Sequence, residues 1–218
     1  MPSDFPRSPR LLKGAIVAYE LPQTFPTIVA FQYNPEHLTR SVQGRSAYRG
    51  GRGDINRTDG PPEETISLTV EIDAVDQLEH PFENVITAVV GLHPAIAALE
   101  RLMYPAFPTV VLNRALAAFG SGAILSEPAP LALFIWGPAR VLPVRVNSVS
   151  ITEQAFDTLL NPIQARADLS LKVLTYRELE MTNPGFWVYM ASFAQKESMA
   201  ALSIAQTAAS AIRGILPI

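Results

Sequence analysis

The stretch Ile66-Ser-Leu-Thr-Val-Glu-Ile-Asp73 decides the fold class. Its apolar residues occupy alternate positions, and hydroxyl or carboxylate side chains fill the positions between them. Successive side chains of a strand point to opposite faces, so this period of two predicts a strand with one face in a core and the other toward water or a neighbour. Residues 164–175 repeat the pattern, with Ala, Leu and Val alternating with Arg, Asp, Ser and Lys.

Further strands are predicted on both sides of this stretch. Apolar and β-branched runs mark residues 11–19, 27–33, 37–42, 130–136 and 141–151. The first two runs are separated by a Pro-rich turn, which favours a hairpin. The apolar phase slips between Val146 and Val149, which indicates a β-bulge. The chain is therefore expected to be mainly β with flanking helices, an α+β fold.

Three helical segments complete the predicted organisation. Residues 81–104 have helical spacing, and Pro94 is expected to kink or split that helix because it lacks an amide hydrogen. Residues 105–130 form an insertion with a short helix near 112–119. The predicted domains are an extended arm at 1–10, a β domain at 11–180 and a C-terminal helical extension at 181–218.

The C-terminal helix is unusually poor in charge. It is predicted to begin at Asn183-Pro184, where a first helical turn tolerates proline, and to end near Arg213. Between Gly185 and Ile212 only Lys196 and Glu197 are charged. A helix without a charged face is either buried or packed in an assembly. The side chains predicted to contact a partner are Trp187, Met190, Phe193, Met199, Leu202 and Ile212.

The composition also favours an assembled protein. The 218 residues include 17 basic and 20 acidic side chains, a formal net charge of −3. No basic excess attracts nucleic acid, so no nucleic-acid partner is expected. Charged residues make up 17% of the chain, against about 25% in a typical soluble domain. Other chains are therefore expected to cover part of the surface.

Catalytic and metal-binding patterns are missing from the sequence. It has no cysteine, no Gly-x-Ser-x-Gly elbow and no phosphate-binding loop, and its three histidines lie singly. We interpret Glu63-Glu64 and Glu178/Glu180 as solvated strand ends rather than acid/base carboxylates. We therefore predict no enzyme, no metal site and no cofactor. The first residues lack the apolar run of a signal peptide, and no run reaches the ~20 apolar residues of a membrane span, so the cytoplasm is the expected site of synthesis.

Residues 43–63 are predicted to form a long basic loop. It carries Arg45, Arg49, Arg52 and Arg57. Binding of phosphate or an acidic polymer is one interpretation. We favour a second, in which a mobile basic loop orders on an acidic neighbouring subunit. The tripeptide Arg52-Gly-Asp54 is short enough to recur by chance, and only Tyr48 offers a stacking ring for single-stranded nucleic acid.

An ordered set of short motifs runs through residues 11–176. The motifs are Phe31-Gln-Tyr-Asn-Pro-Glu36, Leu102-Met-Tyr-Pro105, Pro130-Leu-Ala-Leu-Phe-Ile-Trp-Gly137, Val146-Asn-Ser-Val-Ser-Ile-Thr-Glu-Gln-Ala-Phe156 and Asn161-Pro-Ile-Gln-Ala-Arg-Ala167. This order resembles the tube-domain family of contractile injection systems, relatives of contractile phage tails. The chain departs from the family pattern at Leu160-Asn161, where the family has glycine before proline. It also has the hydrophobic helix in place of the peptidoglycan-binding domain of some members.

The resemblance implies a fold and a role. The fold is two packed antiparallel sheets or a flattened β-barrel of the tail-tube type, flanked by a helix. The subunits would join edge to edge in hexameric rings, which hides their strand edges. The role would be a baseplate hub or adaptor ring between inner tube and spike, or a tube-terminating or inner-tube ring. Tube, spike and baseplate proteins would be its partners, in a phage-tail-like particle that is assembled in the cytoplasm and can be released.

Two other functions remain open from the sequence. A stand-alone binding module would present the Arg-rich loop to phosphate or an acidic polymer. Membrane engagement would use residues 186–216, although the Ser, Gln and Thr content of this segment argues against it. Polar strand faces at 65–73 and 166–172 are either ordinary solvated faces or the lining of a ring lumen.

Overall fold

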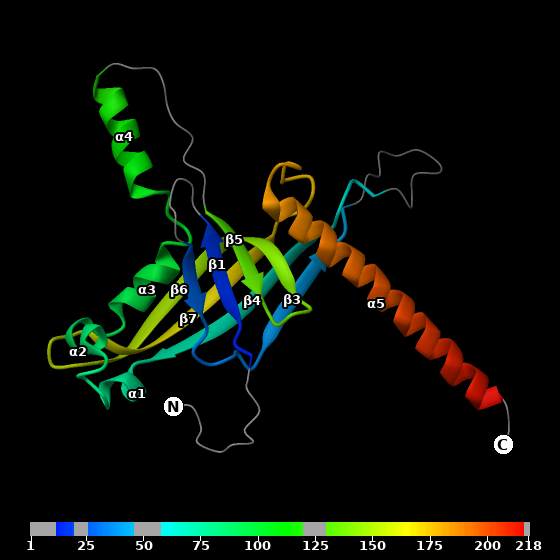
Figure 1. The fold of residues 1–218 in the computed structure, drawn as a ribbon, viewed down its shortest axis with the longest axis horizontal. Helices are drawn as coiled ribbons and strands as arrows, with labels where there is room; N and C mark the ends of the chain where they lie inside the picture. The colour runs from blue at the N-terminus through cyan, green and yellow to red at the C-terminus, as the bar shows by residue number, and fades with distance from the viewer. Residues whose placement is uncertain (1–11, 20–25, 46–57, 120–129, 216–218) are drawn as a thin grey trace.

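A computed structural model describes residues 12–19, 26–45, 58–119 and 130–215, with side chains described through Thr207 (Figure 1). The described strands form one antiparallel sheet in the order β2-β1-β5-β6-β7-β4-β3. Their bounds are β1 Ala15–Tyr19, β2 Thr27–Ala30, β3 Leu38–Gln43, β4 Glu63–Asp73, β5 Leu131–Ile135, β6 Val141–Phe156 and β7 Pro162–Val173. The mainly β prediction is confirmed.

Two local predictions are also confirmed. Strands β1 and β2 pair as an antiparallel hairpin. The register of β6 on β7 shifts between Val146 and Ser148, within the interval where the apolar phase slips. The bulge shifts the alternation of β6, so that Val149 and Ile151 beyond it still pack against the core.

The sheet curls so that its ends approach each other. Gln32 follows β2 by two residues, yet its Oε1 accepts a hydrogen bond of 2.9 Å from the backbone N–H of Asp73 at the end of β4. Five interstrand spacings separate β2 from β4 in the sheet order, which is about 24 Å on a flat sheet. Strong curvature must therefore bring the two ends together.

The flattened-barrel form of the prediction was wrong. β2 and β3 stand at opposite ends of the sheet order, and each pairs with a single neighbour among the described strands. The curl is thus not closed by hydrogen bonds between the edge strands.

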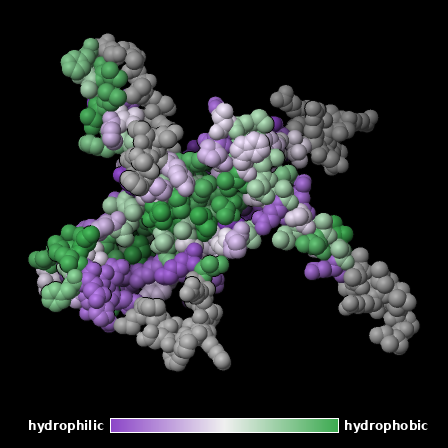
Figure 2. Space-filling model, in the orientation of Figure 1, coloured by the Kyte–Doolittle hydropathy of each residue, from purple (hydrophilic) through white to green (hydrophobic). Residues whose placement is uncertain are grey.

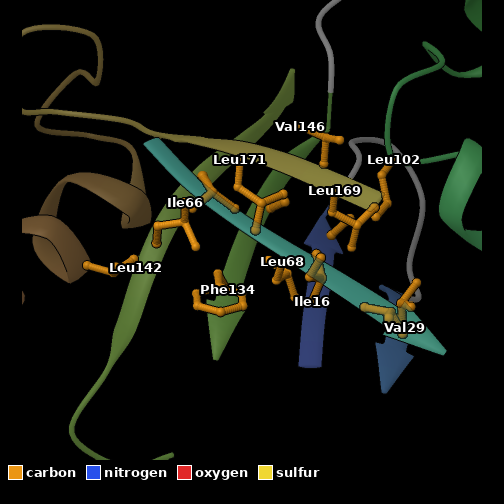
Figure 3. Packing of buried hydrophobic residues seen from close by; sticks show 14 of the residues in the cluster. Ile16, Val29, Ile66, Leu68, Leu102, Phe134, Leu142, Val146, Leu169 and Leu171 are labelled. Carbon is orange, nitrogen blue, oxygen red and sulfur yellow. The ribbon is translucent and has the colours of Figure 1, made fainter. Parts of the chain in front are cut away.

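The core fills the inside of the curl. Alternate residues of β4 and β7, such as Ile66 and Leu171, are fully buried beside Phe134 of β5 (Figure 3). Phe31, Phe134 and Trp136 form an aromatic cluster with ring centroids 5.8 to 6.5 Å apart. Close packing of this kind makes the inner face the main source of hydrophobic stability.

The helix predicted at 81–104 is split. Helix α1 spans Val75–Leu78, α2 spans Val85–Val90 and α3 spans His93–Glu100. The break falls at Gly91, which has φ +57°, a value that glycine adopts more readily than other residues. Pro94 lies in the first turn of α3, where its missing N–H costs nothing. Leu99 and Leu102 close one side of the core.

The remaining helices and the basic loop also differ in detail from expectation. α4 spans Phe107–Ala118, earlier than predicted, with a proline in its first turn. α5 spans Pro184–Ile215, as predicted. The predicted loop at 43–63 is shorter, because Gln43 pairs with Glu63 and the Asp59 N–H donates to the Arg45 carbonyl at 3.0 Å. Residues 46–57 lie outside the described part of the chain.

Candidate interaction surfaces

The first half of α5 is seated on the β domain. Tyr189 and Ser192 are buried, and Tyr189 belongs to the main hydrophobic core. The Tyr189 ring stacks on Phe193 with centroids 6.5 Å apart and lies 6.0 Å from the ring of Tyr176. Burial raises the pKa of the Tyr189 hydroxyl, and Tyr176 and Glu64 act in the same direction. The start of α5 is therefore part of the folded domain.

A buried carboxylate fixes this half of the helix. Glu64, on β4, is 5% exposed. Its Oε2 accepts a hydrogen bond of 2.8 Å from Lys196 Nζ, and Arg40 Nε lies 2.7 Å from its Oε1. The Arg40 contact is a charge pair rather than an aligned hydrogen bond. The interpretation of Glu64 as a solvated strand end was wrong, because α5 and β3 cover it.

The second half of α5 leaves the domain. Residues 200–207 are all exposed, with Leu202 at 58% and Ile204 at 71%. In Figure 1 the helix extends well beyond the sheet. Such a length of unpacked helix is marginal in water on its own. This half is a surface without a partner among the described residues.

The predicted contact residues of α5 are distributed along both halves. Trp187 is 61% exposed and donates its indole N–H to the Met181 carbonyl at 3.1 Å. Met190 and Phe193 are partly exposed beside the seated half, and Met199 is 55% exposed where the helix leaves the sheet. The backbone of Ile212 is helical, and its side chain lies outside the described part.

A groove of about 300 Å³ lies between α5 and the sheet, at the first residues of β4 and β6. Lys196 and Met199 line it from α5, Arg40 and Glu64 from the sheet, and Arg140 from the β5–β6 turn. These side chains carry three positive charges and one negative charge. The half-buried Arg140 has no ion-pair partner among the described residues. We call these five residues the basic groove.

The described part of the Arg-rich loop is engaged within the chain. Arg45 Nη2 lies 3.3 Å from Glu63 Oε2, and hydrogen bonding by Arg45 holds the pKa of Glu63 below its usual value, with help from the charge of Lys172. Lys172 Nζ also lies 2.7 Å from Glu178 Oε1. The predicted site residues Arg49, Arg52 and Arg57 lie outside the described residues.

The outer face of the sheet is polar across four strands. The cross-strand registers place Thr39 of β3 beside Ser67 of β4, Ser67 beside Ser170 of β7, and Ser170 beside Ser148 of β6. In the next row, the Thr69 hydroxyl donates to Asp168 Oδ1 at 2.5 Å. A band of small hydroxyl side chains thus crosses the face, and charged side chains such as Arg166, Asp168 and Lys172 lie in the neighbouring rows.

A second exposed apolar surface lies at the far end of the molecule. Asn161 Nδ2 donates to the Val89 carbonyl, and Leu92 N–H donates to the Pro162 carbonyl, so the β6–β7 turn packs on α2 and α3. Exposed apolar side chains gather here: Phe82, Val85, Ile86, Val89, Phe156, Leu159 and Leu160. Figure 2 shows this patch next to hydrophilic residues. We call residues 73–90 and 153–161 the acidic tip.

Sequence reasoning missed the acidic tip. Its signal was the lack of any Lys or Arg from residue 71 to residue 100, a stretch with six acidic residues. The helical spacing of residues 81–104 predicts instead that their apolar side chains share one face of a helix. The fold instead splits that helix and turns α2 outward.

Other classes of site find no support in the described residues. No group of three His, Asp or Glu side chains is placed to hold a metal ion in the part of the chain that the structure covers. None of the helices, over the same residues, is long and apolar enough to cross a membrane.

No family model matches the chain, and no curated protein matches it significantly.

Proposed function

We propose that this chain is a structural subunit of a contractile injection system, a baseplate hub or adaptor ring that joins the inner tube to the spike. A tube-terminating or inner-tube ring is the alternative position in the same particle. The ordered motifs in residues 11–176 support this proposal, and the mainly β fold is compatible with it. The two-layer tube fold belongs to the same proposal. It is supported by the curl that brings Gln32 to Asp73 across a shared core.

The observation that carries the proposal is the unpartnered second half of α5. Its exposed Leu202 and Ile204 have no counterpart surface among the described residues. An apolar helix held out from its domain gains stability only when another chain covers it. Neighbouring chains would bury this half of α5 in an assembled subunit, whereas it would stay exposed in a monomer.

The polar outer face supports a position around a channel. Ser67, Ser170 and Ser148 lie in one row across three strands, with Thr39 on the edge strand beside them. Small hydroxyls keep water in place and offer passing cargo no apolar area. If copies of the sheet surround an axis, this face suits the lumen.

The two edge strands support joining in a ring. β2 and β3 each keep one unpaired edge among the described strands. Exposed edges invite pairing with another chain, and a repeated contact of this kind closes into a ring if its rotation allows. Six copies is the number implied by the family resemblance.

Truncation after Met199 tests the proposal. Deleting the whole extension from residue 185 would remove Tyr189 from the core and Lys196 from Glu64, so a failed particle could then reflect misfolding. The 1–199 chain keeps both contacts. We expect it to melt cooperatively near the temperature of the full chain and to be missing from phage-tail-like particles sedimented from the native host.

A pair of full-length variants controls for helix length. L202Q/I204Q places amides on the exposed half of α5, and Q206A changes a neighbouring exposed position. We expect the first to be depleted from particles and the second to be incorporated normally. Normal incorporation of the 1–199 chain would overturn the assignment of this half as the assembly surface. A lack of ring-like particles containing the full chain in electron micrographs would overturn the proposed function.

A further inference from the structure

The acidic tip presents an apolar face that none of the described segments covers. Phe82 is 96% exposed, and Leu159 and Leu160 are 76% and 77% exposed. The β6–β7 turn that carries these leucines is internally braced, because Asp157 Oδ1 accepts the Leu159 and Asn161 N–H groups at 2.7 and 2.8 Å. A braced turn holding apolar side chains in solvent is suited to contact with another surface.

The charges around this face all have one sign apart from histidine. Asp76, Glu79, Glu83 and Glu153 are exposed, and none has an ion-pair partner among the described residues. No Lys or Arg occurs between residues 71 and 100 or between residues 146 and 165. A partner for the tip should therefore combine apolar area with positive charge.

The basic groove has these two properties. Arg140 offers a guanidinium with no ion-pair partner in the described part of the chain, and Arg40 with Lys196 outweighs the single carboxylate of Glu64. Met199, 55% exposed at its rim, supplies an adaptable apolar contact. The groove is thus complementary to the tip in both charge and polarity.

The groove and the tip lie at opposite ends of the molecule. β4 begins beside the groove, with Glu64, and ends at the tip, with Asp73 (Figure 1). Nine residues of extended strand separate them, about 30 Å. One chain cannot bring its own tip to its own groove. A second copy can.

We propose that the acidic tip of one copy docks in the basic groove of the next copy. The contact joins two different surfaces, so it is heterologous and extends head to tail until a ring closes or a filament grows. The inference rests on the proposed function only in requiring that the chain assembles with copies of itself. Within such an assembly, the acidic tip and the basic groove are the two surfaces in contact.

Two complementary variants test the docking. The tip variant is E79K/E83K, and the groove variant is R140E/M199E. A control, E36K/E180K, makes the same charge change as the tip variant at exposed positions outside both surfaces. Self-association is measured by sedimentation velocity on the full chain, with circular dichroism and thermal melting to confirm that every variant folds.

The expected results follow from the heterologous geometry. Each surface variant alone should self-associate roughly a hundredfold more weakly than the unmodified chain, because like charges then face each other. The control should associate like the unmodified chain. An equimolar mixture of the two surface variants should recover association, because the intact tip then meets the intact groove and the reversed tip meets a groove of opposite charge. The recovered association should weaken as salt is added.

The overturning results are equally specific. Surface variants that still associate like the unmodified chain, or a mixture that stays monomeric while the unmodified chain associates, would remove the head-to-tail contact. So would an unmodified chain that stays monomeric at all concentrations. Rings seen by electron microscopy with both folded surface variants would reject this contact and leave the proposed function standing.

Discussion

Glu64 and Lys196 are 132 positions apart in the chain, and a hydrogen bond of 2.8 Å joins Glu64 Oε2 to Lys196 Nζ. The carboxylate is buried and the ammonium is 41% exposed at its side chain. Burying a carboxylate is unfavourable unless cations compensate it. Arg40 and Lys196 do so from opposite sides, β3 and α5. The helix is thereby held to β4, the strand whose residues 66–72 alternate between apolar and polar side chains.

Replacing Lys196 with methionine should therefore destabilise the fold. Met keeps most of the aliphatic contact and removes the charge, which leaves Glu64 with Arg40 alone. We expect a loss of about 1–2 kcal/mol in the free energy of unfolding, less than for a fully buried pair because Lys196 is partly solvated. Urea denaturation measures this loss, and E197Q on the same helix is the control. An equal loss from K196M in an E64Q background would show that the pair is not coupled.

The strands were predictable because each depends on its own side chains. The alternation in β4 and β7 requires only that one face be buried, and Ile66 and Leu171 are buried as expected. Glu64 has the same local environment in sequence as any strand-end carboxylate. Its burial depends on α5 returning to β4, and no local pattern encodes that contact.

The surfaces were harder to predict than the strands. The acidic tip exists because the β6–β7 turn lies against α2 through Asn161 and Val89, and the two segments are remote in sequence. The basic groove likewise combines α5, β3, β4 and the β5–β6 turn. For α5, the low charge predicts a partner surface, and Leu202 lies exposed on the half where a partner would bind. The sequence did not indicate which half of α5 packs on the β domain, because that depends on Tyr189 reaching the core.

The carboxylates around Lys172 should make stability depend on pH. Burial raises the pKa of Glu178, but hydrogen bonds from Lys172 and Thr175 outweigh it, and the pKa lies below the ordinary 4.5. The pKa of Glu63 is lowered as well, first by its hydrogen bond from Arg45. For groups with a lowered folded pKa, the stabilisation is present above the unfolded value of 4.5 and is lost as pH falls through the folded values.

Replacing Lys172 with methionine should flatten this acid dependence. Lys172 contacts both Glu63 and Glu178, so without it both pKa values move toward the unfolded value. We expect the melting temperature of the unmodified chain to fall between roughly pH 5 and pH 3, and that of K172M to fall less. R145M removes a cross-strand neighbour of Lys172 that has no carboxylate partner among the described residues. If R145M flattens the curve equally, the Lys172 contacts are not its cause.

The break between α2 and α3 should not tolerate a side chain at Gly91. A Cβ there would lie 2.4 Å from the Pro162 carbonyl oxygen, and the φ of +57° disfavours any other residue. We expect G91A to cost more than about 2 kcal/mol of unfolding free energy, from strain and collision together. G137A separates the two effects, because Gly137 has φ +75° and open space around it; about 1 kcal/mol is expected there. Equal losses in the two variants would rule out the collision.

Leu160 should be held at the tip at some cost to stability. It is the non-glycine residue with positive φ in the described chain, at +64°, and its side chain is 77% exposed. A leucine in the left-handed conformation costs about 1 kcal/mol or more. Because the side chain is exposed in the free chain, no hydrophobic burial offsets this cost. L160G should therefore raise the melting temperature, whereas L159G, at the neighbouring exposed position, should not. The same L160G change removes apolar area from the tip and should weaken self-association measured by sedimentation. A variant that is more stable and associates as strongly as the unmodified chain would show that Leu160 serves neither the fold nor the contact.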